Sequence, residues 1–511
     1  MYVQGRHIVD DEGRILILRG CNLGENTPPQ PEEAEARFAE FCVRGFTLVR
    51  LFITWEALEP EEPGAYDEAY LACLRKILII AEKRGLPVFI SPGRENRNSG
   101  EGLPAWLLEK IGLDSKGRDP SKPYAGATLS TLFFAGNRFA PEFYIEGVKA
   151  QEWLQERYLA AMRHCFRRLK NCAALAGWNA AGLPGRGFIG GKGSERKDAM
   201  GFVPDPLQVM AAASGYQGEM PAAGSGPSRG VSLFKPGHTC LWKQAGVWTD
   251  EGGSPRLLKG DYFDFAGDKP VCFSEDFLKP FMLRFIGRMR EAREKTLFLI
   301  GDVPGEGPPA WLPGDPPGVV HLFRYPADPP GPIEMVRKAR ERMGDIPNLA
   351  EGGGPDPADL TDPADLTDPA DLTDPAALSR YYDGLDENLL HGILGAYGPG
   401  PLPAGITRPY PMATAGIPLG IRWDREKRVF TYRFRADADI PVPTEIYIPP
   451  LCSGGEPGIS VREPEAEPGA GAIRTFYDRE QGKGIITNAG YRGDIEIVIT
   501  WSERKNSSIR L

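Results

Sequence analysis

The residues that could do chemistry in this sequence are few and widely scattered. Five histidines and eight cysteines are present, but the histidines lack the H-x-x-x-H spacing of a metal site, and no cysteines form a C-x-x-C pair. The glycine-rich stretch 185–193 lacks the first glycine and the Ser/Thr of a phosphate-binding loop. We therefore expect no metal and no cofactor, and we expect the cysteines to be buried free thiols.

Apolar runs that alternate with amphipathic segments must position whatever site the chain carries. The predicted strands include 46–54, 86–92, 172–178, 296–304 and 318–326, and the predicted helices between them include 31–45, 69–85 and 151–171. Short apolar strands separated by helices indicate a parallel sheet. At this chain length the pattern predicts an α/β fold, a (β/α)8 TIM barrel with long loop insertions.

The remaining segments break this alternation. A stretch over about 185–260 is rich in Gly, Pro and Ser and is expected to be an insertion. Four tandem hexads begin at Asp356, Asp362, Asp368 and Asp374, and we expect a surface loop within a second insertion at about 352–380. From about residue 408, alternating strands predict an antiparallel β-sandwich. The predicted domains are therefore a barrel at 1–404 and a sandwich at 405–511.

Composition and charge exclude several partners. The chain has 511 residues, a net charge of −9 and no basic cluster, so nucleic acid is not expected to bind. No run approaches the 18 apolar residues of a transmembrane helix, and the first residues lack a signal-peptide pattern. We expect a cytoplasmic protein, and the sequence leaves its oligomeric state open.

Barrel geometry selects the candidate site residues, because active sites of TIM barrels lie at the carboxyl ends of the strands. The positions at these ends are Arg50, 91–95, 182–184, 323–325, Glu351 and 395–397. Two carboxylates about 5 Å apart at such ends would indicate a retaining glycosidase. The sequence has one carboxylate, Glu351, at such a strand end, whereas a retaining glycosidase needs two.

Eight segments of the chain together resemble glycoside hydrolase family 5, in the branch of endoglycoceramidase-like glucosylceramidases and steryl β-glucosidases. They occur in the family's order and span almost the whole chain: LRGCNL (18–23), FTLVRLFITWEALEP (46–60), GAYDEAYL (64–71), CLWKQAGVW (240–248), LLKGDYF (257–263), DIPNLAEGG (345–353), RPYP (408–411) and PTEIYIP (443–449). The resemblance implies a (β/α)8 barrel and a β-glucoside or glycolipid bound at the barrel mouth.

The resemblance also implies roles for single residues. Glu351 matches the catalytic nucleophile, Arg50 the arginine that supports it, and Tyr325 a tyrosine of the substrate-binding site. The residues themselves leave a second interpretation of Glu351 open, a structural carboxylate paired with Arg50. In either case such a pair would keep Glu351 ionised.

The chain departs from the family where the chemistry should be. The acid/base glutamate of the family's Asn-Glu-Pro falls on Leu183, within Gly182-Leu183-Pro184. Two family histidines fall on Gly93 and Phe323, and a sugar-stacking tryptophan falls on Gly395. A general acid contributes roughly 10² to 10⁴ in rate, so these replacements predict impaired catalysis.

Three hypotheses follow for function. The first is a glycoside hydrolase family 5-like protein related to retaining β-glucosidases and catalytically impaired. The second is an active hydrolase of O-glycosyl compounds that uses Glu351 as nucleophile and a relocated acid such as Glu95 or Glu195. The third is a non-enzymatic module that binds a glycan, a glycolipid or a protein.

Overall fold

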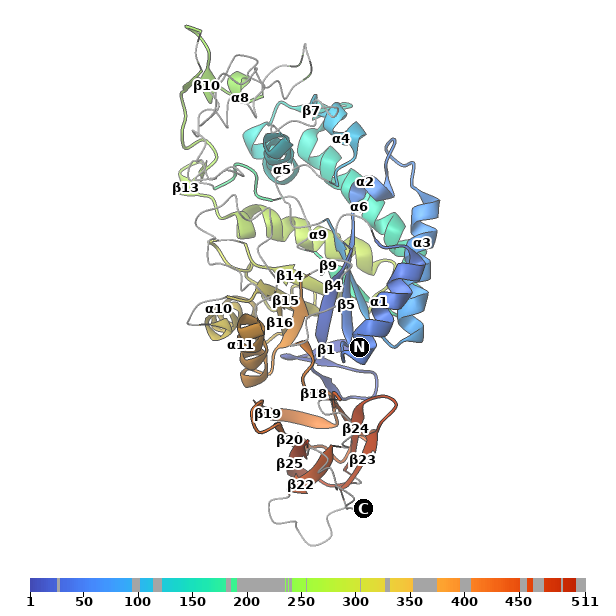
Figure 1. Ribbon diagram of the computed structural model, residues 1–511. Helices are drawn as coiled ribbons and strands as arrows, with labels where there is room; N and C mark the ends of the chain where they lie inside the picture. Colours follow the sequence, from blue (N-terminus) through green and yellow to red (C-terminus); the bar gives the residue numbers. More distant parts are fainter. Residues whose placement is uncertain are drawn as a thin grey trace, which may run out of the picture.

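A computed structural model gives the architecture of the chain (Figure 1). The described residues are 1–24, 28–93, 102–113, 122–180, 185–190, 235, 238, 241–253, 255–303, 305–326, 331–352, 375–395, 406–450, 457–462, 473–488 and 490–501. The predicted fold class is confirmed, because these residues form a closed parallel barrel and a pair of antiparallel sheets.

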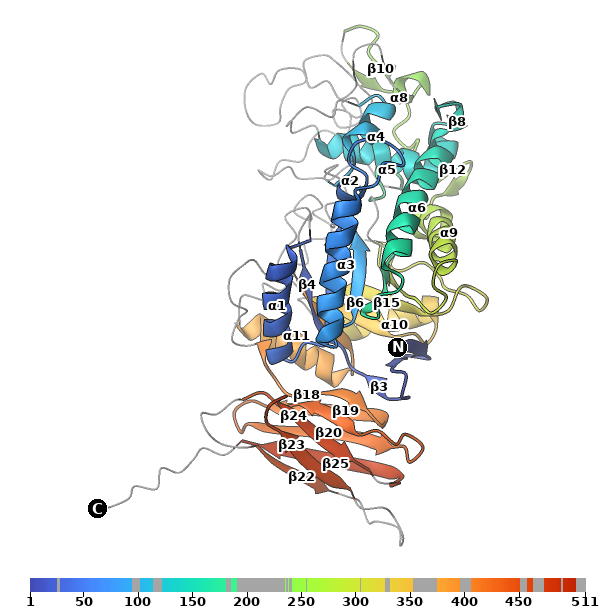
Figure 2. The ribbon, with the colours of Figure 1, turned by 90° about the vertical axis from the view of Figure 1, so that its right-hand side faces the viewer.

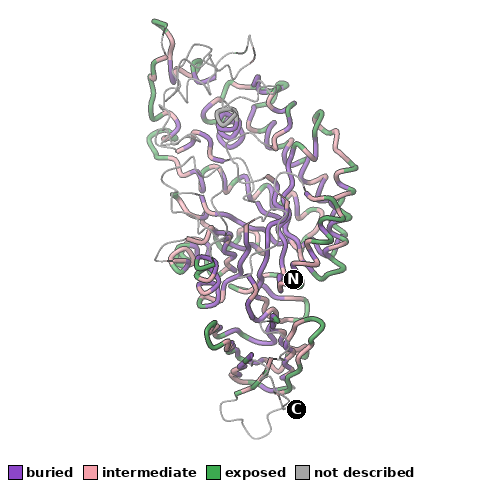
Figure 3. Tube along the Cα trace, viewed as in Figure 1, coloured by how far each residue is buried: buried purple, intermediate pink, exposed green. Residues whose placement is uncertain are grey.

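The barrel consists of eight parallel strands whose residues are mostly buried. In barrel order they are β4 (Arg19–Leu23), β5 (Leu48–Ile53), β6 (Val88–Pro92), β9 (Leu175–Asn179), β14 (Leu297–Gly301), β15 (Val319–Arg324), β16 (Asn348–Gly352) and β17 (His391–Leu394). Alternate side chains point inward and fill the barrel, among them Leu48, Phe89, Leu299, Val320 and Leu349. The barrel interior is thus a packed core, and only the strand ends can carry a site (Figure 3).

Helices pack around the outside of this barrel. The principal ones are α1 (Pro31–Val43), α3 (Glu68–Lys83), α6 (Ala150–Leu169), α9 (Lys279–Arg290), α10 (Pro332–Met343) and α11 (Pro375–Glu387). The Asp67 side chain caps α3 by accepting a hydrogen bond from the Tyr70 amide, and Leu71, Leu74 and Leu78 bury one face of the helix. The last hexad supplies the first turn of α11, so the insertion expected over 352–380 ends before Pro375.

Further elements lie beyond the end of the barrel opposite the two sheets (Figures 1 and 2). They are the helices α2 (Trp55–Leu58), α4 (Ala105–Lys110), α5 (Lys122–Phe139) and α8 (Leu241–Gln244), the π-helix η1 (Ser274–Leu278), and the paired strands β7 (Tyr144–Ile145) with β8 (Val148–Lys149), β10 (Trp248–Thr249) with β11 (Arg256–Leu257), and β12 (Phe265–Ala266) with β13 (Lys269–Pro270). Aromatic rings join this region: Phe188 and Trp242 both pack against Phe263. The predicted insertion therefore contains ordered, buried residues.

Two antiparallel sheets form the sandwich at the other end (Figure 2). One has the order β19 (Gly416–Asp424), β20 (Val429–Ala436), β25 (Gly493–Thr500) and β22 (Gly458–Arg462). The other has the order β1 (Tyr2–Gln4), β2 (His7–Val9), β3 (Ile15–Leu16), β18 (Tyr410–Thr414), β21 (Thr444–Tyr447), β24 (Lys483–Thr487) and β23 (Arg474–Asp478). The first 16 residues thus extend a sheet whose other strands begin near residue 410.

The barrel contacts this second sheet closely through backbone carbonyls. The Tyr410 hydroxyl donates to the Gly45 carbonyl at 2.6 Å, and the Tyr447 hydroxyl donates to the Val43 carbonyl at 2.7 Å. Gly45 has a positive φ of 78°, and a Cβ there would collide with the Tyr447 ring. The sandwich is therefore seated directly on the turn that follows α1.

Candidate active site

Glu351 lies at the carboxyl end of β16, one residue before the strand ends. Its side chain shares the inward face of the strand with Leu349, which packs in the barrel interior. The Glu351 side chain is 13% exposed. It is the only acidic residue in the eight barrel strands, all of which the structure describes in full.

Two side chains from neighbouring strands hold this carboxylate. The Arg50 Nη2 of β5 donates to Glu351 Oε1 in an ion pair, and the Asn22 Nδ2 of β4 donates to the same oxygen at 2.9 Å. Arg50 Nε also donates to Asn22 Oδ1 at 2.9 Å, which closes a three-residue network. Arg50 is fully buried, so its charge and the two donated hydrogen bonds favour the ionised form of Glu351.

The network leaves one donor of Arg50 unused. Its Nη1 is buried and has no hydrogen-bond partner in the described part of the chain, while its guanidinium lies 4.9 Å from the centre of the Phe52 ring. A buried guanidinium nitrogen with no acceptor is unfavourable, and a hydroxyl group of a bound ligand could satisfy it. Glu351 and Arg50 were both selected from the sequence. Asn22 was not, although it lies in the LRGCNL segment of the resemblance.

The backbone of Tyr325 contacts the backbone of Glu351, whereas the Tyr325 side chain points toward α11. Its amide donates to the Glu351 carbonyl at 2.7 Å. Its ring packs edge-on against Tyr381 of α11 at 5.0 Å, and its hydroxyl donates to the Arg380 carbonyl at 3.2 Å. The geometry therefore directs the hydroxyl toward α11, and a substrate-binding role for Tyr325 stays a prediction.

Arg324 takes the position on β15 that faces the barrel axis. Val320 and Leu322 pack in the interior, and alternation along the strand gives Arg324 the same face. In the parallel register Arg324 is the partner of Glu351. Arg324 was expected only as part of the range 323–325, because the sequence does not determine which residue at a strand end points toward the barrel axis.

The strand that should present the acid/base residue ends in an amide. Asn179 of β9 donates from Nδ2 to the Ser91 Oγ of β6 at 2.9 Å, and both side chains are buried. Leu183 lies outside the described residues, as do Glu95 and Glu195, the two candidates for a relocated acid. The ranges 182–184 and 396–397 also lie outside them.

Glu306 is a described carboxylate that follows β14 and contacts the start of η1. Burial raises the pKa of Glu306, but hydrogen bonds from the Ser274 amide and hydroxyl and the charge of Arg186 bring the pKa below its ordinary value. A carboxylate with a lowered pKa is ionised at neutral pH and has no proton to donate. Glu306 therefore carries a negative charge that Ser274 and Arg186 stabilise.

Two kinds of feature are not found in the described part of the chain. Among the described residues, no cluster of three or more His, Cys, Asp or Glu side chains could hold a metal ion. No described helix is long and apolar enough to cross a bilayer. Among the described residues, the site consists of the Glu351 carboxylate, held by the buried Arg50 guanidinium and the Asn22 amide.

Comparison with known proteins gives relatives that agree with this architecture. A family model, the glycoside hydrolase family 5 C-terminal domain, matches residues 408–484. A glucosylceramidase of Rhizopus delemar is 28% identical over 395 residues, which cover 60% of this chain and 56% of that protein. A glucosylceramidase of Cryptococcus neoformans var. grubii is 29% identical over 399 residues, covering 60% of this chain and 53% of that protein. The matches thus span about half the length of these relatives.

A solved structure extends the likeness to the whole fold. The crystal structure of Cryptococcus neoformans sterylglucosidase 1 superimposes with a TM-score of 0.76 at 20% identity, over 99% of this chain and 98% of that chain. At this identity the likeness concerns the fold. Together with the sequence relatives, it confirms the resemblance that the eight segments indicated.

Proposed function

From the relationship of this chain to the glucosylceramidase branch of glycoside hydrolase family 5, we propose that it binds a β-glucoside or glycolipid at the barrel mouth and hydrolyses it poorly or not at all. The observation that carries the proposal is that Glu351 is the only carboxylate in the eight barrel strands. A retaining mechanism needs a second carboxyl group about 5 Å away to protonate the leaving oxygen. The sequence has Leu183 at that position.

The missing acid matters most for natural leaving groups. A sugar or lipid alkoxide is a poor leaving group near pH 7, and general acid catalysis supplies roughly 10² to 10⁴ in rate. Leucine has neither a proton to donate nor a charge. The retained network around Glu351 supports ligand binding, because Arg50 Nη1 is a buried donor that a sugar hydroxyl can satisfy.

A thermal-shift measurement tests the binding half of the proposal. We expect alkyl β-glucosides to raise the melting temperature of the full chain, because a ligand that binds only the folded state stabilises it. The exposed Arg337→Gln variant on α10 should show the same shift, whereas Asn22→Leu, which removes one donor to Glu351, should reduce it. An unchanged melting temperature with every β-glucoside tested would contradict binding at the mouth.

A second candidate function, hydrolysis with Glu351 as nucleophile, is favoured by the ionised and partly accessible Glu351 carboxylate. An activated dinitrophenyl fluoroglucoside needs no general acid for departure of its leaving group and traps a covalent glycosyl-enzyme. This candidate predicts an adduct on Glu351 in the intact-mass spectrum, and no adduct with Glu351→Gln. A spectrum without adduct in the unmodified protein would remove this candidate and leave the binding proposal standing.

A further inference from the structure

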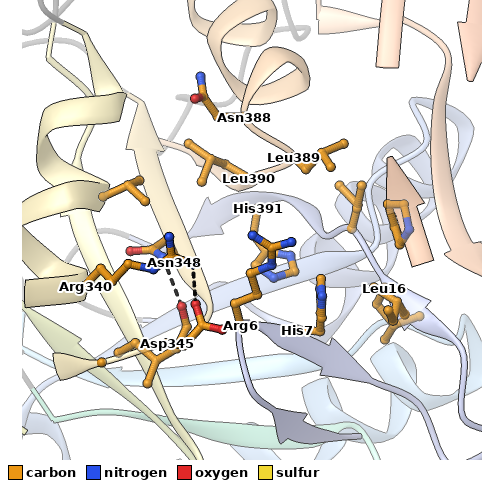
Figure 4. A pocket seen from close by; sticks show the side chains of 16 residues that line it. Arg6, His7, Leu16, Arg340, Asp345, Asn348, Asn388, Leu389, Leu390 and His391 are labelled. Atoms are coloured by element: carbon orange, nitrogen blue, oxygen red, sulfur yellow. Dashed lines mark hydrogen bonds and ion pairs between the residues drawn. The ribbon is translucent and has the colours of Figure 1, made fainter. Parts of the chain in front are cut away.

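A cavity of about 160 Å³ lies at the opposite end of the barrel from Glu351, where the N-terminal strands meet α10, the end of α11 and β19. Figure 4 shows it from close by. One part of its wall is apolar, formed by Ile15, Leu16, Val336, Ile346, Leu389 and Leu390, and polar or charged side chains line the rest. Every residue that lines it belongs to the described part of the chain. A cavity of this size holds a compact ring, since engineered apolar cavities of about 150 Å³ bind benzene.

His391 presents a hydrogen-bond donor at this cavity. Its Nδ1 accepts a hydrogen bond from the Leu18 amide at 3.0 Å. Burial, together with the charges of Arg19 and His7, lowers the pKa of His391 to about 3, so the ring is neutral. A neutral imidazole that accepts at Nδ1 carries its hydrogen on Nε2. The ring is buried and lines the cavity, and its Nε2 has no hydrogen-bond partner among the residues described.

Two more nitrogen-bearing side chains line the cavity. Figure 4 labels them as Arg6 and His7, and the charge of His7 contributes to the lowered pKa of His391. The Arg6 guanidinium forms no ion pair within the described ranges, and the His7 ring makes no hydrogen bond there. Arg340 and Asp345, also in the lining, form an ion pair with each other at 2.6 Å. The unpaired charge of the lining is therefore the cation of Arg6.

From this arrangement, we infer that the cavity is a binding site for a small monocarboxylate with a compact apolar body, such as an aromatic acid. The carboxylate would accept hydrogen bonds from the Arg6 guanidinium and the His391 Nε2–H, and the ring would lie on the apolar wall. Hydrogen bonds to a charged group are worth about twice those between neutral groups, so the anion is preferred over a neutral molecule of the same shape. The apolar wall disfavours a bare inorganic anion.

Titration calorimetry of the full chain with benzoate tests the inference. We expect benzoate to bind with a Kd on the order of 1 mM, about tenfold tighter than benzyl alcohol or inorganic phosphate. Arg6→Gln should weaken benzoate binding by about tenfold, because it removes the cation at an exposed turn. Arg337→Gln, on the outer face of α10, should leave the Kd unchanged. Equal affinities for benzoate and benzyl alcohol would overturn the inference.

A second variant separates this cavity from the barrel mouth. Val336→Phe places a ring in the cavity and should abolish benzoate binding while the melting temperature stays the same or rises. The glucoside-induced thermal shift should be unaffected, because Glu351 lies at the other end of the barrel. Benzoate binding that survives both Arg6→Gln and Val336→Phe would place the ligand elsewhere and overturn the inference, whatever the outcome of the glucoside measurements.

Discussion

At the scale of single residues, Glu351 is held by an ion pair and a hydrogen bond. Its carboxylate neutralises Arg50, which is fully buried, and accepts from Asn22. We expect Glu351→Gln to lower the free energy of unfolding by about 1–3 kcal/mol, because a buried guanidinium loses its counter-charge. Chemical denaturation measures this change, and the exposed Glu341→Gln should stay within about 0.5 kcal/mol. A more stable Glu351→Gln variant would indicate a strained carboxylate instead.

His391 makes a separate prediction about pH. The pKa of its folded-state imidazole, about 3, lies below the ordinary 6.5, so between these values the unfolded chain binds a proton that the folded chain excludes. The stability contributed by the neutral ring is complete above pH 6.5 and falls as the pH decreases, by about 1.4 kcal/mol per unit. Denaturation at pH 7, 6 and 5 should therefore show a steeper loss in the unmodified protein than in His391→Gln. Parallel curves would contradict a neutral buried imidazole.

Single residues also show how far the sequence can predict a site. Glu351 could be selected because it lies near the carboxyl end of a predicted strand, and Arg50 because it matches an arginine of the resemblance within the run that becomes β5. The direction of the Tyr325 side chain could not be predicted from the sequence. Neighbouring residues at the end of a strand point to opposite faces, so an error of one residue in the position of β15 would exchange the directions of Arg324 and Tyr325. Asn22 went unselected because an amide at a strand end carries no chemical signature of its own.

At the scale of elements, a buried charge cluster joins α11 to the barrel and to the segment before β18. Asp386 pairs with Arg19 of β4 at 3.0 Å and with Arg408 at 3.0 Å, and all three side chains are less than 10% exposed. We expect Asp386→Asn to cost about 3–5 kcal/mol of stability, because it leaves two buried cations under-compensated. Asp383→Asn on the same helix, where the side chain is 49% exposed, should cost less than about 1 kcal/mol. Equal losses in thermal denaturation would contradict this difference.

The elements that the sequence predicted best are those formed by local patterns. Apolar runs predicted the barrel strands, and alternation from residue 408 predicted the sandwich strands. The pairing of β3 with β18 joins Leu16 to Ala413. A contact between residues so far apart in the sequence cannot be predicted from local sequence patterns. The last hexad was predicted as loop because its repeat resembled the preceding copies, whereas Leu378 and Tyr381 bury it as the start of α11.

For the whole molecule, the fold resembles that of glycosidases, and we propose that the strand ends carry only one of the two expected carboxyl groups. The barrel is closed, its interior is packed, and the sandwich is seated on it. The closed barrel and its contact with the sandwich depend on many buried side chains. Hydrolysis of an alkyl glycoside by a retaining mechanism depends on only two carboxyl groups, about 5 Å apart. We propose that Leu183 replaces one of the two, a change that would lower activity at little cost to folding, and hence that the protein binds without efficient turnover.

The rate of glucose release from glucosylceramide and from aryl β-glucosides tests this account most directly. A typical enzyme turns over at about 10 s⁻¹, and loss of the general acid alone lowers the rate by roughly 10² to 10⁴. For the natural glycolipid we therefore predict release by the unmodified full-length protein no faster than about 0.1 s⁻¹. Release at about 1 s⁻¹ or faster that disappears in Glu351→Gln would contradict the account.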